Sequence, residues 1–166
     1  MTEVSSKKHK QSPSLKARAL RLLSRREYSR KELAHKLFQT VTQKSADVPN
    51  DLEEQIEKVL CEFEKQGWLS DSRYAEALVR RRSQRYGMRR VTEELQRAGI
   101  EQSTISRLSQ DLKDTEFERA HALWERKFGQ ISYEQKERAR QYRFLISKGF
   151  NPELVTRLIS GHSQSK

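Results

Sequence analysis

Apolar residues recur along most of the chain at the three- and four-residue spacing of amphipathic helices. Leu15, Ala19, Leu22 and Leu23 form the first such stripe, with arginines on the opposite side. Further stripes follow, and the nine of them begin near Leu15, Leu33, Leu52, Ala75, Met88, Ile105, Phe117, Tyr142 and Leu154. The pattern predicts an all-α protein made of nine short helices.

Capping residues fit the stripes. Four pairs have the spacing in which a cap oxygen precedes Glu or Gln by three residues, namely Ser29 and Glu32, Asn50 and Glu53, Thr115 and Glu118, and Ser132 and Gln135. Asn151 is expected to cap a helix that has proline at its first position. Gly67, Gly99 and Gly149 follow apolar runs, where a left-handed residue commonly ends a helix.

The chain also repeats itself. A shift of 58 residues aligns Ala17 with Ala75, Leu20 with Leu78, Tyr28 with Tyr86, Lys31 with Arg89, Leu33 with Val91, and Leu37 with Leu95. A third, weaker copy aligns Leu95, Gly99 and Ile100 with Leu145, Gly149 and Phe150. This repeat predicts three tandem three-helix modules, helix-turn-helix-like, in an elongated and curved arrangement. The expected divisions are a disordered basic tail (1–13), modules at 14–70, 71–113 and 114–160, and a flexible tail (161–166).

Composition narrows the picture further. Apolar residues make up only 34% of the chain, which favours several thin cores over one large core. The 34 Lys and Arg residues exceed the 23 Asp and Glu residues, for a net charge of +11. Residues 1–50 carry +8, residues 51–70 carry −4, residues 71–98 carry +4 and residues 99–166 carry +3. Such an excess attracts a polyanion, and nucleic acid or a partner bound to nucleic acid is the favoured one.

Other features limit the class of protein. Cys61 is the single cysteine, so no intrachain disulfide can form, and a reducing cytoplasm is expected. No apolar run is long enough to span a membrane, and no signal peptide is expected. No phosphate loop, nucleophile elbow or zinc spacing occurs, so we expect no enzyme, no cofactor and no metal. Cys61 is expected to be a half-buried apolar filler.

Arginines are the candidate contacts to DNA or to a partner, because closely spaced positive charges repel one another unless an anion neutralises them. The candidates are Arg18, Arg21, Arg25, Arg73, Arg80, Arg81, Arg82, Arg85, Arg89, Arg90, Arg138, Arg140 and Arg143. Some have structural alternatives: Arg89 and Arg90 could pair with Glu93 and Glu94 four residues on. The stem of Arg82 could pack, and Arg73 follows an expected Asp71 cap.

The aromatic residues and the acidic segment each have two possible roles. Trp68, Tyr74, Tyr86, Trp124, Phe128 and Phe144 could stack on bases, although aromatic residues on helix stripes are mostly core. Five glutamates crowd the segment 53–64 and form either a solvated face or a face toward a partner.

Several segments resemble the RecX family, bacterial regulators of the RecA recombinase. The resemblance lies in Gly67-Trp68-Leu69-Ser70-Asp71-Ser72-Arg73-Tyr74-Ala75, in Arg81 to Ile100, in Arg143-Phe144-Leu145-Ile146-Ser147-Lys148-Gly149-Phe150, and in Tyr28 to Leu37. It covers about residues 14 to 160. At three positions this chain differs from the residues that are common in the family. It has Ser70 in place of aspartate, Met88 in place of proline and Lys148 in place of arginine.

The resemblance implies a cytoplasmic, monomeric negative modulator that binds the groove of the RecA filament on single-stranded DNA. It implies inhibition of ATPase, strand exchange and co-protease activity, and thereby a role in regulating recombination, DNA repair and the SOS response. Single- or double-stranded DNA would be contacted directly or through the filament. The alternative is a sequence-reading or nonspecific helix-turn-helix-like DNA-binding protein, because three-helix units also build that class.

Overall fold

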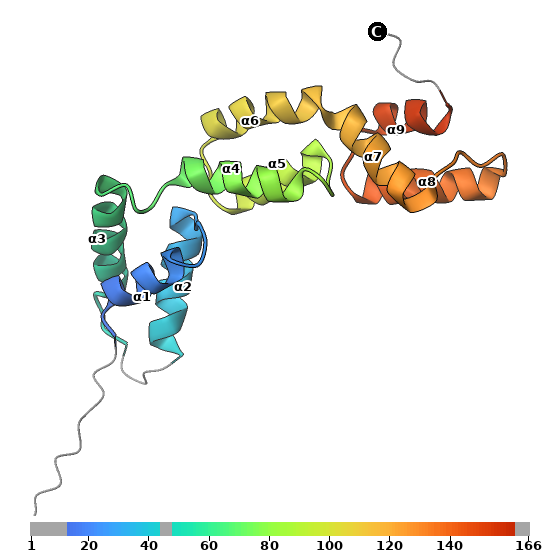
Figure 1. Ribbon diagram of the computed structural model, residues 1–166. Coiled ribbons are helices and arrows are strands. Elements are labelled where there is room, and N and C mark those ends of the chain that lie inside the picture. The colour runs from blue at the N-terminus through green and yellow to red at the C-terminus, as the bar shows by residue number, and fades with distance from the viewer. Residues whose placement is uncertain (1–12, 44–47, 162–166) are drawn as a thin grey trace, which may run out of the picture. The chain divides into compact units, whose positions relative to one another are not determined.

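The computed structural model describes residues 13–43 and 48–161, and all regular structure in those ranges is helical (Figure 1). The helices described are α1 (Leu15–Leu23), α2 (Arg30–Thr42), α3 (Leu52–Lys65), α4 (Asp71–Arg82), α5 (Met88–Arg97), α6 (Gln102–Asp114), α7 (Glu116–Phe128), α8 (Gln135–Ser147) and α9 (Pro152–Ile159). The predicted all-α fold is therefore confirmed. The tails expected at 1–13 and 161–166 lie outside these ranges, except Pro13 and Gly161.

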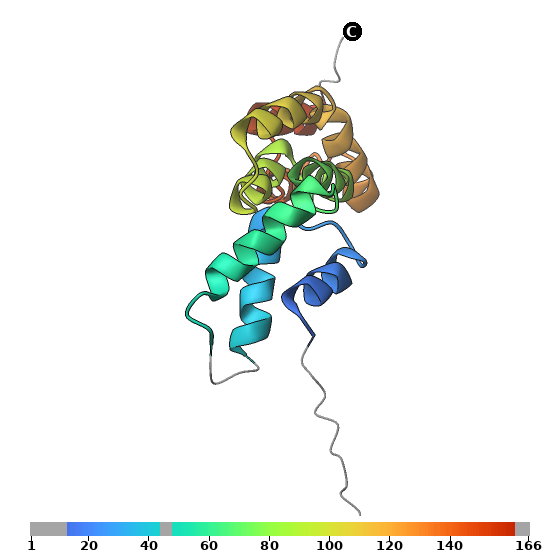
Figure 2. The ribbon, with the colours of Figure 1, turned by 90° about the vertical axis from the view of Figure 1, so that its left-hand side faces the viewer.

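The chain divides into two compact units. The first unit ends at Leu69, and the second begins at Ser70 and also includes Ser29–Lys31. In the first unit, α1, α2 and α3 surround one small core (Figure 2). Leu33, Leu37, Leu60 and Phe63 are fully buried there. Burial of one such side chain contributes about 1.5–3 kcal/mol, so a few residues decide whether this unit folds.

The second unit holds two cores, one for each set of three helices. Helices α4, α5 and α6 pack together around Val91 and Leu95, which are completely buried. Helices α7, α8 and α9 pack around Leu145 and Val155 in the same way. In Figure 1, α6 lies over α4 and α5, and α7 leads from the end of α6 to α8. Three successive three-helix modules with separate cores confirm the predicted repeat, while the module boundaries and the curved arrangement stay predictions.

The glycine stops were predicted well. Gly67, Gly99 and Gly149 follow α3, α5 and α8 with φ angles of 71°, 78° and 87°. These angles lie in the left-handed region that a residue without a Cβ occupies at little cost.

The helix starts were predicted less well. Asn151 does cap α9, accepting hydrogen bonds from the amides of Glu153 and Leu154. The Asn50 prediction was wrong, because Asp51 precedes α3 directly and makes no side-chain cap bond. Ser132 was also wrong: α8 begins only at Gln135, and the Ser132 hydroxyl accepts from the Glu134 amide in the preceding turn.

Two further starts differ in detail. Thr115 stands at the cap position of α7, but its hydroxyl donates back to the Asp111 carbonyl instead of capping. Ser70, not Asp71, caps α4 by accepting from the Arg73 amide. Asp71 is the first residue of that helix, where a carboxylate still favours the positive end of the helix dipole.

The Asn151 cap gives a stability prediction. Asn151→Ala should lower the free energy of unfolding by about 1 kcal/mol, because two amides of α9 lose their acceptor. Ser132→Ala is the matched control and should cost less, since its hydroxyl caps no helix. Urea unfolding followed by circular dichroism measures both. Equal losses for the two variants would contradict the assignment of the caps.

Candidate partner- and DNA-binding surface

The exposed arginine cluster lies where α4 ends. Arg80 and Arg81 occupy the last turn of α4, and Arg85 lies in the Ser83–Gly87 loop that leads to α5. All three side chains are exposed, and no hydrogen bond or ion pair holds them within the described residues. Positive charge in a last turn is favourable because the carbonyl end of a helix carries partial negative charge. The fold thus presents three available guanidinium groups together.

The remaining predicted arginines of this segment are engaged. Arg82 Nε donates to Glu94 at 2.9 Å. Arg89 and Arg90 reach the carbonyls of Ile146 and Ser147 at the end of α8, at 3.5 and 3.4 Å. The expected pairs with residues four positions on are therefore wrong, since Glu94 pairs with Arg82 and Glu93 pairs weakly with Arg97.

Tyr86 is the centre of a cationic group. The Arg90 guanidinium carbon lies 4.5 Å from the centroid of its ring, Arg82 lies 5.5 Å away and the Lys148 ammonium 5.6 Å away. A cation over an aromatic ring gains about 0.5–1 kcal/mol at a site open to solvent. Tyr86 therefore holds three positive charges at the junction of the second and third modules, and little of its face is left for a base.

The two modules of the second unit meet backbone to backbone at Gly87. Its amide donates to the Lys148 carbonyl at 2.9 Å. A Cβ at position 87 would lie 2.2 Å from the Gly149 carbonyl oxygen, a distance that atoms do not reach. Only glycine fits this contact. The φ angle of Gly87 is −70°, so the requirement comes from space and not from backbone conformation.

Glu116 and Arg119 of α7 complete this junction, and the sequence analysis missed both. Arg119 donates to the carbonyls of Ser83, Tyr86 and Leu112 at 2.7, 2.9 and 2.6 Å. Burial lowers the pKa of Arg119, and the charge of Glu116 partly opposes this effect. An arginine stays protonated at neutral pH despite such a shift.

The buried carboxylate of Glu116 accepts a hydrogen bond from the Met88 amide at 2.9 Å. Met88 is the first residue of α5, where the backbone amides have no partner within the helix. Glu116 therefore satisfies one amide of another module and places negative charge at the positive end of α5.

The first-unit arginines line a groove of about 270 Å³. Arg18, Arg21 and Arg25 border it together with Pro13, Leu22 and Thr40. Arg18 is held in place because it donates to the carbonyls of Pro13 and Thr40 at 2.8 and 2.9 Å. Arg21 and Arg25 are exposed. Of the three arginines in the predicted stripe, Arg18 therefore has a structural role, and Arg21 and Arg25 are available to a partner.

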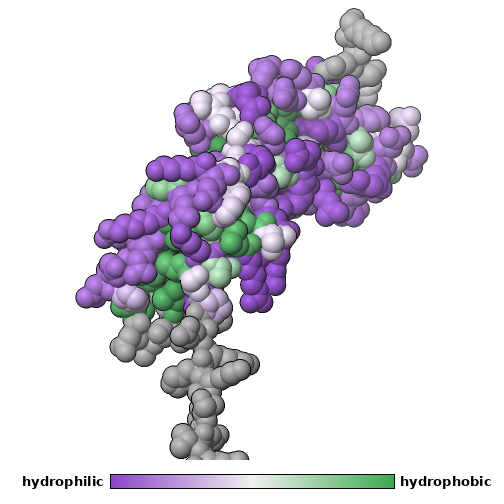
Figure 3. All heavy atoms as spheres, turned by 60° about the vertical axis from the view of Figure 1, so that its left-hand side comes forward, coloured by the Kyte–Doolittle hydropathy of each residue, from purple (hydrophilic) through white to green (hydrophobic). Residues whose placement is uncertain are grey.

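The first unit also exposes apolar and acidic side chains, in contrast to the basic groove. Four large apolar side chains are exposed on this unit, namely Leu20, Phe38, Val48 and Trp68. Figure 3 shows apolar residues gathered among hydrophilic ones over this part of the molecule. Phe38 lines a groove of about 330 Å³ whose rim carries Glu53 and Glu57. Carboxylates repel phosphate, so this groove is unsuited to nucleic acid.

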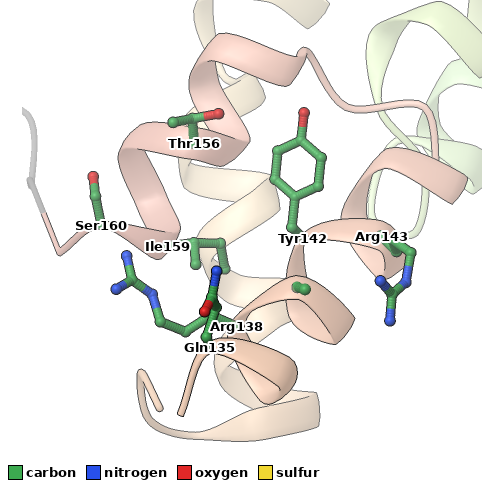
Figure 4. A pocket seen from close by; sticks show the side chains of 8 residues that line it. Gln135, Arg138, Tyr142, Arg143, Thr156, Ile159 and Ser160 are labelled. Atoms are coloured by element: carbon green, nitrogen blue, oxygen red, sulfur yellow. The ribbon is translucent and has the colours of Figure 1, made fainter. Parts of the chain in front are cut away.

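The third-module arginines are divided between two sides of α8. Arg138 and Arg143 border a groove of about 370 Å³ between α8 and α9, together with Tyr142 (Figure 4). Arg140 instead pairs with Glu137 at 3.3 Å on the same helix. The last predicted candidate, Arg73, is exposed in the first turn of α4.

Most of the aromatic residues named above serve packing. Tyr74 and Trp124 are buried, and the indole N–H of Trp124 donates to Gln141. Phe128 and Phe144 pack edge to face. Trp68 is the exception, with 48% of its surface exposed. Cys61 is half-buried, as expected.

Two absences hold for the part of the chain that the structure describes. Residues 13–43 and 48–161 contain no group of three His, Cys, Asp or Glu side chains that could bind a metal ion. None of their helices is long and apolar enough to cross a bilayer.

Three family models match the chain in the order of its modules. They describe the first, second and third three-helix domains of RecX, and they match residues 16–40, 70–108 and 114–159. A regulatory protein RecX of Ralstonia pickettii is 41% identical over 149 residues, which cover 89% of this chain and 87% of that protein. The chain belongs to the RecX family.

Other RecX proteins agree over similar lengths. The regulatory protein RecX of Herbaspirillum seropedicae is 44% identical over 138 residues, covering 83% of this chain and 84% of that protein. The crystal structure of RecX from Lactobacillus salivarius superposes with a TM-score of 0.67 at 21% identity, over 89% of this chain and 94% of that one. This last match shows a shared fold. The relatives are named as regulatory proteins, and RecX is not a family of enzymes.

The junction of the second and third RecX modules can be tested at Gly87. Gly87→Ala should lower the stability of the second unit by about 1–3 kcal/mol or more, because the added methyl overlaps the Gly149 carbonyl. The amide of Met88 should then exchange its hydrogen faster, as its bond to Glu116 is strained. Hydrogen exchange measured by NMR reports this change.

Gly67→Ala is the matched control. A Cβ there meets nothing within 4 Å, and its cost comes from the positive φ alone. It should leave the exchange of the Met88 amide unchanged. Equal protection of Met88 in the parent protein and in Gly87→Ala would contradict the close contact.

Proposed function

We propose that this protein is a negative modulator of RecA that binds the groove of the RecA filament on single-stranded DNA. Binding would inhibit the ATPase, strand exchange and co-protease activity of the filament. The observation that carries the proposal is the match of all three RecX domains in order, with relatives named regulatory protein RecX. Action as a cytoplasmic monomer, in recombination, DNA repair and the SOS response, belongs to the same proposal.

The distribution of charge supports this role. Each module offers guanidinium groups to solvent, such as Arg21 in the first, Arg81 in the second and Arg143 in the third. A protein with repeated small modules can make several shallow contacts along a polymer, each of modest strength. The acidic α3, with Glu53 and Glu57 exposed, would face basic protein and not DNA.

A helix-turn-helix-like DNA-binding function is the alternative. It needs polar side chains available at the start of a recognition helix. Asn151, at the start of α9, is occupied as a cap and offers little to a base. The alternative predicts preference for particular duplex sequences, which selection from random duplexes would reveal.

The direct test uses a RecA filament on single-stranded DNA with ATP. Addition of this protein well below equimolar amounts should slow ATP hydrolysis and strand exchange. The expected cause is that a protein bound in the groove or at the filament end affects many protomers. No inhibition at excess protein would contradict the proposal.

The second-module cluster gives a variant prediction. Arg81→Glu combined with Arg85→Glu should weaken filament binding about tenfold or more, since two favourable contacts to anionic groups become repulsive. Circular dichroism should stay unchanged because both side chains are exposed. Binding is measured by fluorescence anisotropy with a labelled protein.

Lys113→Glu combined with Arg126→Glu makes the same charge change at exposed positions outside the candidate clusters and serves as control. If both double variants bind the filament equally well, the Arg81 cluster is not part of the surface that binds it.

A further inference from the structure

We propose that the groove between α8 and α9 binds one nucleotide of a single-stranded nucleic acid, with the base on Tyr142 and the phosphates on Arg138 and Arg143. This inference deepens the proposed function by adding a direct contact to the nucleic acid. It starts from the shape of the site. The groove measures about 370 Å³, within the range of small-molecule sites, and Figure 4 shows the side chains that line it.

The base of the groove is apolar. Ala139, the Tyr142 ring and Ile159 line it. Tyr142 is half-buried, so its position is fixed by packing against the third core while part of its ring faces the groove. A flat aromatic ring beside aliphatic surface is the arrangement on which proteins stack bases without reading their sequence.

The sides of the groove are basic. In Figure 4 the Arg138 and Arg143 side chains extend on opposite sides of Tyr142. Residues five apart on a helix are separated by about 7.5 Å along its axis and by about 140° around it, so the two arginines border the groove from different sides. Both guanidinium groups are exposed, and no hydrogen bond or ion pair occupies them in the described part of the chain. Each can therefore hold a phosphate.

Hydroxyl groups complete the groove. Thr156 of α9 and Ser160, the residue after α9, line it, and their hydroxyls donate to the carbonyls of Pro152 and Arg157, both at 2.9 Å. A hydroxyl oxygen that donates its hydrogen keeps lone pairs, so the Thr156 oxygen can still accept a hydrogen bond from a sugar hydroxyl or a base amino group. No Asp or Glu lines this groove. The groove near Phe38 has two glutamates on its rim, so the two sites differ in the sign of the ligand they accept.

The partial charges at the ends of α8 and α9 attract neither an anion nor a cation to the groove. The first residue of α8, Gln135, and the residue after α9, Ser160, both line it. The positive end of one helix dipole therefore lies near the negative end of the other, and the two partial charges offset one another. The arginines then determine the potential of the site.

The test uses the full-length protein without RecA and a fluorescently labelled oligothymidylate. Binding is measured by anisotropy at several salt concentrations. Each phosphate contact on a single strand contributes about 0.7 to the slope of log K against log salt. Arg138→Ala combined with Arg143→Ala should lower the slope by about 1.4. Arg140→Ala is the matched control on the same helix, because Glu137 already pairs with Arg140.

The aromatic contact needs its own variants. Tyr142→Leu should weaken binding about 5- to 150-fold, the usual effect of losing one stacked base, while leucine keeps apolar bulk against the third core. Tyr142→Phe should bind like the parent protein. Circular dichroism checks that the helices persist in all variants.

The inference is overturned if the Arg138/Arg143 variant keeps the slope and affinity of the Arg140→Ala control, or if Tyr142→Leu binds as tightly as Tyr142→Phe. The outcome is independent of the RecA assay. The unmodified protein can inhibit the filament without binding free oligonucleotide, and it can bind oligonucleotide without inhibiting. Failure of one proposal is thus distinguishable from failure of the other.

Discussion

The close approach of Gly87 to Gly149 is the contact on which the second unit depends. Thin cores such as those around Leu95 and Leu145 bury few side chains each, so neither set of three helices has much stability to spare. Backbone contact at Gly87 brings the end of α8 near enough for Arg89 and Arg90 to reach its carbonyls. The second and third modules are thus held together by hydrogen bonds between polar groups, whereas a larger protein would use buried apolar side chains.

Arginine has two distinct uses in this structure. Arg18 and Arg119 are tied to several backbone carbonyls, and Arg119 fills its donors almost completely. Arg81 and Arg143, on helices, and Arg85, in the loop after α4, project without such partners in the described residues. Five donors in a planar fork suit both uses. A count of basic residues therefore overstates the number of guanidinium groups that are available to a partner.

Sequence reasoning was strongest where a local rule decides the outcome. The stripes place Leu33 and Leu95 in cores because helical spacing fixes which residues share a face. Asn151 was found because the adjacent proline fixes the first position of α9. Ser132 was misassigned because α8 begins three residues later, at Gln135, and the spacing between a serine and a glutamine does not by itself show where the first helical turn forms. Glu116 and Arg119 were missed because charged side chains look solvent-exposed until another module packs over them.

Met88 has a consequence for how this family can vary. Its backbone amide donates the hydrogen bond that the buried Glu116 carboxylate accepts. Proline carries no amide hydrogen, so a relative with proline there would leave a buried carboxylate without that donor. Positions 88 and 116 are therefore expected to substitute as a correlated pair across RecX sequences, with an acidic residue at 116 accompanying a non-proline at 88.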